Sequence, residues 1–158
     1  MEIKGERIIN ADRQTVWEAL NDPDLLCRAI PGCQQMEGSP EEGFTATVTQ
    51  KVGPVKATFK GVVRLEDVVP AESYRLVGEG KGGVAGFAKG SAKVRLEDVP
   101  EGTRLSYTVD ARVGGKLAQL GGRIIGGFAR KMADAFFERF QNLLEGRAAE
   151  DDGTDATG

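Results

Sequence analysis

The chain has 158 residues, 40% of them hydrophobic, and a formal net charge of −3. This length and composition predict one soluble globular domain with a substantial core, and the small net charge excludes a strong attraction to nucleic acid. The sequence contains no histidine, which excludes histidine-dependent catalytic triads, imidazole general bases and histidine metal ligands. We therefore expect no catalytic residues and no metal site.

The N-terminal part predicts a strand followed by two short helices. Residues 2–10 alternate loosely between polar and apolar side chains, as strands do. Asp12 is a candidate N-cap for the first helix, and Pro23 opens the second. A turn at Pro31-Gly32 ends the second helix. The apolar side chains of the two helices are Val16, Trp17, Leu20, Leu25, Leu26 and Ile30.

The two cysteines, Cys27 and Cys33, are six residues apart. This spacing matches neither a CxxC motif nor a zinc site. A disulfide between them would require the fold to bring them together. We expect two reduced, partly buried thiols, which are typical of a cytoplasmic protein.

The middle of the chain predicts an antiparallel β-meander. Apolar and polar residues alternate with period two in successive runs, and turns at hairpin distances separate the runs. Because one side of each run is polar, one face of the sheet is expected to meet water. The runs cover residues 44–53, 54–67, 74–80, 88–98 and 103–113.

Residues 116–145 predict one amphipathic helix, which at about 1.5 Å per residue would be roughly 45 Å long. Its apolar row runs at intervals of four from Leu120 to Leu144. The glycine pairs 121–122 and 126–127 interrupt this helix, and each glycine costs about 1 kcal/mol relative to alanine.

This order of elements predicts an α+β fold, in which a curved antiparallel sheet of about six to seven strands wraps around the long C-terminal helix. Only that helix is available to cover the apolar face of the sheet. We assign residues 1–146 to this ligand-binding domain. Residues 147–158 are small and acidic, and we expect a disordered tail there.

Two glycine motifs match known patterns without the context that those patterns need. Gly78, Gly80 and Gly83 match GxGxxG, but a dinucleotide site needs a helix at that point and the strand pattern continues instead. Gly122 and Gly126 match GxxxG, but the charged residues nearby rule out a membrane-spanning dimer helix. We assign neither motif a function.

Small residues recur on both expected walls of the hollow between sheet and helix, including Gly61, Gly78 and Ala92 on the strands. Small residues leave either close contact or empty space, and native cores tolerate few voids. We favour an apolar ligand cavity, with close packing and no ligand as the alternative. The expected ligand-binding residues are Leu26, Ile30, Phe59, Phe87, Ala92, Tyr107, Leu120, Gly121, Ile124 and Phe128.

Three stretches of the sequence carry a family resemblance: VWEALNDPDLLCRAIPGC (16–33), VGPVKATFKG (52–61) and GGKLAQLGGRIIGGFARKMADAFFERF (114–140). They resemble the CoxG family of carbon monoxide dehydrogenase subunits, within the START-like, helix-grip (SRPBCC) superfamily. The resemblance covers about residues 1–145 and implies the helix-grip fold, with two short helices after the first strand.

The resemblance implies a non-catalytic accessory factor of molybdenum-containing CO dehydrogenases and related hydroxylases. Such factors recruit the enzyme to the inner face of the cytoplasmic membrane and link it to the respiratory quinone pool. We therefore expect a quinone such as menaquinone in the cavity. Tyr107 or the backbone amides of residues 30–32 would donate hydrogen bonds to a quinone carbonyl.

Several alternatives to quinone binding stay open. The chain could be a general carrier of lipids or other apolar ligands, or a pure protein-docking factor. Some helix-grip proteins are cyclases or hydrolases, but the inward positions here carry almost no ionisable groups.

No apolar run approaches the roughly 18 residues of a transmembrane helix. The first residues, MEIKGERIIN, lack the apolar core of a signal peptide. Family members often carry a membrane-associated C-terminal extension, whereas the segment after Gly146 is acidic and has no apolar anchor.

Overall fold

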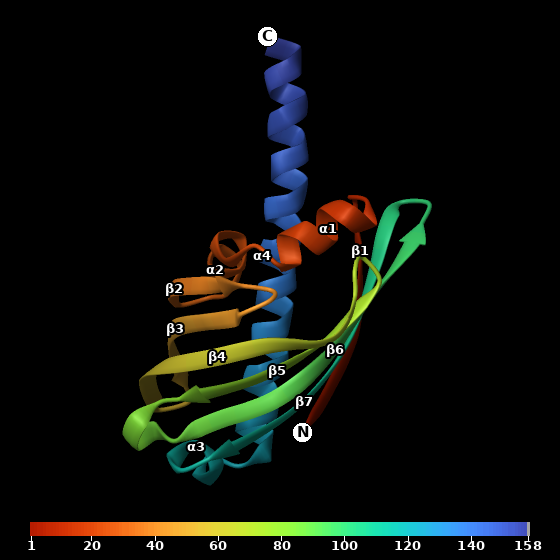
Figure 1. The fold of residues 1–158 in the computed structure, drawn as a ribbon. Coiled ribbons are helices and arrows are strands. Elements are labelled where there is room, and N and C mark those ends of the chain that lie inside the picture. Colours follow the sequence, from red (N-terminus) through yellow and green to blue (C-terminus); the bar gives the residue numbers. More distant parts are fainter. Residues whose placement is uncertain (158) are drawn as a thin grey trace.

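A seven-stranded antiparallel sheet curves around one long helix (Figure 1). The computed structural model describes the backbone of residues 1–157 and the side chains of residues 1–146. The strands are β1 (Glu2–Ile9), β2 (Cys33–Ser39), β3 (Gly43–Val52), β4 (Val55–Val69), β5 (Ser73–Lys81), β6 (Phe87–Val99) and β7 (Gly102–Gly114). The helices are α1 (Arg13–Leu20), α2 (Pro23–Ala29), the 3₁₀ turn η1 (Gly83–Ala85), α3 (Lys116–Gln119) and α4 (Gly122–Thr157).

The strand order is β1-β7-β6-β5-β4-β3-β2, so β2 to β7 form a meander and β1 closes it beside β7. After β1, helices α1 and α2 carry the chain to the other edge of the sheet, where β2 begins (Figure 1). This architecture confirms the predicted α+β helix-grip fold. Strand β2 was not predicted, because its sequence CQQMEGS lacks period-two alternation.

Side-chain caps begin both short helices; the Asp12 cap and the position of Pro23 were predicted, and the Asp22 cap was not. The Asp12 carboxylate accepts a hydrogen bond from the Thr15 amide at 2.7 Å, and this bond lowers the pKa of the carboxyl group. The Asp22 carboxylate accepts from the Asp24 amide at 3.0 Å, and Pro23 occupies the first turn of α2. These caps satisfy backbone donors that the first helical turn leaves unpaired.

The main core lies between the inner face of the sheet, the two short helices and the middle part of α4. Phe140 of α4 and Leu105 of β7 are fully buried there. The Tyr107 ring stacks on the Phe137 ring at a centroid distance of 4.5 Å. Other members of this core include Ile9, Val16, Leu20, Leu25, Tyr74 and Leu144.

The predicted single helix over residues 116–145 is wrong at its first end, because the chain breaks between α3 and α4. Gly121 has φ +87°, a conformation that glycine adopts without steric cost. Its carbonyl accepts the Ile125 amide at 3.1 Å, so it lies at the start of α4. The predicted tail, residues 147–158, lies outside the residues whose side chains are described, and its disorder stays a prediction.

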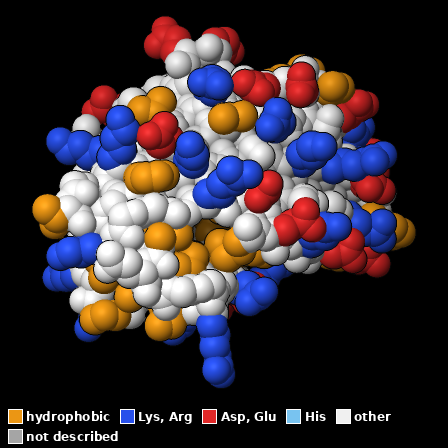
Figure 2. Space-filling model, turned by 90° about the horizontal axis from the view of Figure 1, so that it is seen from below, with side chains coloured by type: hydrophobic (Ala, Val, Ile, Leu, Met, Phe, Trp, Pro, Cys, Tyr) orange, Lys and Arg blue, Asp and Glu red, His pale blue; other side chains and the backbone are white. Residues whose placement is uncertain are grey.

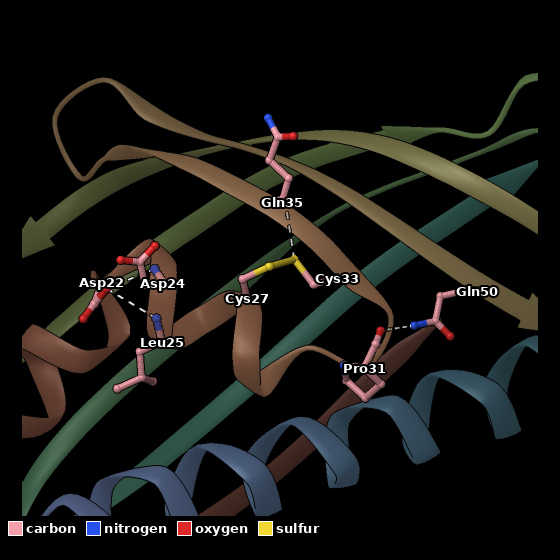
Figure 3. The surroundings of a disulfide bond; sticks show 8 residues. All are labelled: Asp22, Asp24, Leu25, Cys27, Pro31, Cys33, Gln35 and Gln50. Carbon is pink, nitrogen blue, oxygen red and sulfur yellow. Dashed lines mark hydrogen bonds between the residues drawn. A yellow bond between two sulfur atoms is a disulfide. The ribbon is translucent and has the colours of Figure 1, made fainter.

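The prediction of two reduced thiols is also wrong: Cys27 of α2 and Cys33 of β2 form a disulfide (Figure 3). The turn after α2 brings the two Cα atoms to 5.3 Å, within the range that a disulfide requires. Gly32 makes the turn possible with φ +79°, and a Cβ there would lie 2.1 Å from the Thr49 carbonyl oxygen. The Gln50 side-chain amide donates to the Pro31 carbonyl in the same turn.

Candidate functional site: an apolar hollow on the inner face of the sheet

A hollow of about 410 Å³ opens on the inner face of the sheet. It lies between the main core and a smaller cluster formed by Val52, Leu117 and Ile125. Seen from below, hydrophobic side chains gather around a recess near the middle of that view (Figure 2). The inward side chains at the hollow are Ile30, Met36, Ala46, Val48, Phe59, Val63, Leu76, Ala88, Ala92, Val109 and Ala111, with Gly61, Gly78, Gly80 and Gly90 between them.

Small residues in register create this space. Gly61 of β4 lies opposite Ala46 of β3 on one side and Gly80 of β5 on the other. A second row crosses the sheet through Gly78 and Gly90, and β7 continues it with Ala111. Because cross-strand partners point to the same face, each row removes side-chain volume from one continuous strip.

The floor of the hollow carries no charged side chain among the described residues. Glu79 and Lys89 border it, but strand alternation directs both side chains to the outer face. The inner surface therefore offers aliphatic contacts, the Phe59 ring and the Met36 thioether. Such a surface can bind an apolar ligand.

Three of the residues predicted for ligand binding line the hollow: Ile30, Phe59 and Ala92. Leu26 is buried on α2 and does not line the hollow. Leu120 and Phe128 pack with Phe59 into the smaller cluster instead.

The structure places the remaining predicted residues elsewhere. Phe87 lies on the outer face, with the Lys89 ammonium 5.9 Å from its ring centre, because odd-numbered residues of β6 point outward. Ile124 is 44% exposed, and a Cβ at Gly121 would meet nothing within 4 Å. Among the described residues, none from α3 or α4 lines the hollow. Gly121 and the glycines of α4 therefore do not line the hollow.

Tyr107 belongs to the main core and does not line the hollow. Burial, with a smaller contribution from Asp134, raises the pKa of its phenol. The stack on Phe137 orients the ring toward α4. This position gives no support to Tyr107 as a hydrogen-bond donor to a ligand in the hollow.

Several lining residues were missed by the sequence analysis. Met36 lies on β2, which that analysis did not predict. Val48, Leu76 and Val109 follow the period-two pattern of predicted strands, so the pattern identified their face. Their position along the strand depends on the cross-strand register, which a single sequence does not define.

Solved structures confirm the fold. A conserved protein from Geobacillus kaustophilus is 29% identical, with a TM-score of 0.84 over 92% of this chain and 95% of that chain. A protein from Rhizobium leguminosarum is 17% identical, with a TM-score of 0.72 over 92% of this chain and 94% of the other. The protein Ara h 8.0201 is 16% identical, with a TM-score of 0.62 over 92% and 98% of the two chains. The last two comparisons concern the fold alone.

The sequence comparisons identify the family. A search of curated proteins finds no match. The model of the CoxG family, described as a subunit of carbon monoxide dehydrogenase, matches residues 5–145. This range includes every strand from β2 to β7, most of β1 and all the residues that line the hollow. The chain therefore belongs to the CoxG family of carbon monoxide dehydrogenase subunits.

Proposed function

We propose that this protein is a non-catalytic accessory factor that holds a respiratory quinone, such as menaquinone, in the apolar hollow. In this role it couples a molybdenum CO dehydrogenase-type hydroxylase to the membrane quinone pool. The family is named for a subunit of that enzyme, which supports an accessory role. The observation that carries the ligand proposal is the strip of small residues that hollows the sheet.

The size and chemistry of the hollow suit a ring with an isoprenoid tail. Its volume of about 410 Å³ falls within the roughly 300–1,000 Å³ of small-molecule sites. The Phe59 ring offers an aromatic surface, and the aliphatic side chains around it suit a hydrocarbon tail. The carbonyl groups of a quinone need few polar partners, so an apolar wall costs them little hydrogen bonding when they face the open side.

The protein would then act by presenting the quinone as an electron acceptor at the partner enzyme. The chain itself holds and orients the ligand, and among the described residues that line the hollow no ionisable side chain points into it. We place the contact between this protein and the partner enzyme at the inner face of the cytoplasmic membrane, next to the bilayer that contains the quinone pool. No helix within the described part of the chain is long and apolar enough to cross a membrane.

Solvent extraction tests the identity of the ligand. The purified protein is extracted with organic solvent, and the extract is identified by mass spectrometry. Recovery of a quinone near one per protein supports the proposal. Recovery of phospholipid or fatty acid instead would make the protein a general lipid carrier. An empty extract, together with no uptake of added menaquinone, would leave a pure protein-docking role.

A volume-filling substitution tests the site. Ala92→Phe places a ring in the hollow between its cross-strand partners Leu76 and Val109, and we expect at least tenfold weaker menaquinone binding. Overpacking costs about 1–3 kcal/mol, so the variant should fold. Val62→Phe is the matched control, because Val62 is 60% exposed on the outer face beside Gly61. Equal affinity in the two variants would place the ligand elsewhere.

A further inference from the structure

The two edges of the sheet differ in how well they are protected against pairing with another strand. Strand β2 forms one edge, where the register shifts between Cys33 and Gln35 and the disulfide ties the strand to α2. Strand β1 forms the other edge beside β7, as a regular run over Glu2–Ile9 (Figure 1). A long, regular edge strand presents a row of main-chain groups to which another strand can pair.

The main-chain groups of β1 point alternately toward β7 and away from it. Met1 and Ala111 exchange both of their main-chain hydrogen bonds, at 2.9 and 3.2 Å, and the register continues one to one along the strand. The odd-numbered residues of β1 therefore bond to β7, whereas the amides and carbonyls of the even-numbered residues face the open edge. These even-numbered residues are Glu2, Lys4, Glu6 and Ile8.

One group at this open edge is already bonded. The Gln141 side chain of α4 donates a hydrogen bond to the Ile8 carbonyl at 3.0 Å. Among the described residues, no other side chain and no strand bonds to the main chain of β1 on that side. The main-chain groups of Glu2, Lys4 and Glu6 are therefore available to a partner.

The side chains of these residues alternate in charge. Glu2, Lys4 and Glu6 are all exposed, and they share one face of β1 because they are two residues apart. The Lys4 ammonium lies 3.5 Å from the Glu2 carboxylate, and Glu6 makes no ion pair among the described residues. An exposed pair within one strand contributes little, so Lys4 can pair with another carboxylate at little cost.

We propose that two copies of this chain pair through their β1 strands, antiparallel and about a two-fold axis at Gly5, so that the two sheets become one. In this register Lys4 of each copy lies opposite Glu6 of the other. These two residues exchange main-chain hydrogen bonds across the edge, and their side chains pair opposite charges on the outer face. Two-fold dimers of this kind are the commonest homo-oligomers.

Gly5 suits the position on the axis. Residues that lie opposite one another without exchanging hydrogen bonds bring their Cα atoms to about 4.5 Å in an antiparallel pair. Two glycines meet at this short distance with no side chains to accommodate. The Tyr107 side chain of the same copy occupies the space that a Cβ on Gly5 would need, so the inner side of this position is already filled.

The charges select this register over its neighbours. Moving the axis by one residue would place Lys4 opposite Lys4, or Glu6 opposite Glu6, and like charges directly opposite destabilise a strand pair. An axis at Ile3 would pair Lys4 with Glu2 over a shorter overlap. A second copy therefore fits the edge best when the axis lies at Gly5, because the reversed strand supplies the complement of its own charges.

Sedimentation velocity of the full chain, from micromolar to millimolar concentration, tests the dimer. The pairing uses one strand from each copy, so the native dimer should dissociate on dilution. Lys4→Glu and Glu6→Lys should each weaken dimerisation by roughly tenfold or more, because like charges then lie opposite. An equimolar mixture of the two variants should dimerise again, because each supplies the charge that the other lacks.

Two variants elsewhere on the sheet control for net charge. Lys56→Glu on β4 and Glu41→Lys in the β2–β3 turn make the same changes of charge at exposed positions away from β1. Both should dimerise as the native chain does. A loss of the dimer in these controls would attribute the effect to net charge and overturn the pairing through β1.

Hydrogen exchange of single amides, followed by NMR, locates the contact. The amides of Lys4 and Glu6 should exchange several times more slowly in concentrated than in dilute protein, because only the dimer bonds them. The amides of Gly5 and Arg7 bond to β7 within one copy and should be protected at both concentrations. Protection of Lys4 and Glu6 that does not change with concentration would contradict the proposal.

The remaining outcomes are equally decisive. A native chain that stays monomeric up to millimolar concentration overturns the proposal. A Glu6→Lys variant that dimerises as tightly as the native chain rules out the axis at Gly5. If the native chain is monomeric and Lys4→Glu loses the hydroxylase in a pull-down, the edge binds another protein and the proposal is wrong. None of these measurements depends on quinone binding, so the proposed function is tested separately.

Discussion

Glycines that are identical in the sequence have different roles in the structure. In the stretch LGGRIIGG, Gly121 has φ +87° and separates α3 from α4, whereas Gly127 lies within α4. A Cβ on Gly126 would approach Arg130 and the Met1 sulfur, at 3.4 and 3.7 Å. The role of each glycine therefore depends on its backbone conformation. The residue type alone does not specify that conformation.

A matched pair of alanine substitutions tests this difference. Gly121→Ala should lower the free energy of unfolding by about 1–2 kcal/mol, because a side chain opposes the left-handed conformation. Gly127→Ala should raise it by about 0.5–1 kcal/mol, because alanine favours the helix interior. A Cβ meets nothing within 4 Å at either position, so packing does not confuse the comparison. Urea denaturation measures both, and equal effects would contradict the helix break.

Residue type alone could not select the ligand-binding side chains. Phe59 and Phe87 are both apolar strand residues in the sequence, yet Phe59 lines the hollow and Phe87 lies on the outer face. The β5–β6 turn determines the orientation of Phe87. It sets where β6 begins, and hence whether the even-numbered or the odd-numbered residues of β6 face inward. A one-residue difference in that turn reverses the face of every residue on the strand.

At the scale of elements, the disulfide joins α2 to the edge strand β2. The segment from α2 to β2 carries Ile30 and Met36, which both line the hollow. The spacing of the cysteines did not predict the bond, because six residues can be extended or folded back. The turn at Gly32 folds them back, which is a property of the backbone.

Removal of this disulfide should destabilise the protein modestly. The double variant Cys27→Ser/Cys33→Ser should lose about 2 kcal/mol in the free energy of unfolding, because the bond closes a short loop in the unfolded chain. Chemical denaturation with and without dithiothreitol measures the effect. Reductant should bring the native protein to the stability of the variant and leave the variant unchanged. A native protein that is indifferent to reductant would show that the bond does not form.

At the scale of the whole molecule, two buried tyrosines link stability to alkaline pH. Burial raises the pKa of Tyr74 above its ordinary value of 10.0, and burial followed by the charge of Asp134 raises that of Tyr107. The folded protein therefore holds both phenol protons more tightly than the unfolded chain does. The resulting stability is fully present below pH 10 and is lost as the pH rises above it.

Urea denaturation between pH 8 and 11 measures this dependence. We expect the free energy of unfolding to fall above pH 10, by at most about 1.4 kcal/mol per pH unit for each phenol. Tyr74→Phe keeps the ring in the core and removes one ionisable group, so its stability should fall less steeply. A variant with the same slope as the native protein would show that Tyr74 titrates normally.

The amino-acid sequence was sufficient to predict the class of fold, the two short helices with the Asp12 cap, and the order of the meander strands from β3 to β7. These features depend on local periods and capping residues, which are written in consecutive positions. The edge strand β2, the disulfide, the break at Gly121 and the location of the hollow became visible only in the folded chain. Each of these depends on which residues meet across strands or on one left-handed backbone position. Cross-strand register aligns Gly61 with Gly80 and Gly78 with Gly90, and this alignment turns scattered small residues into one site.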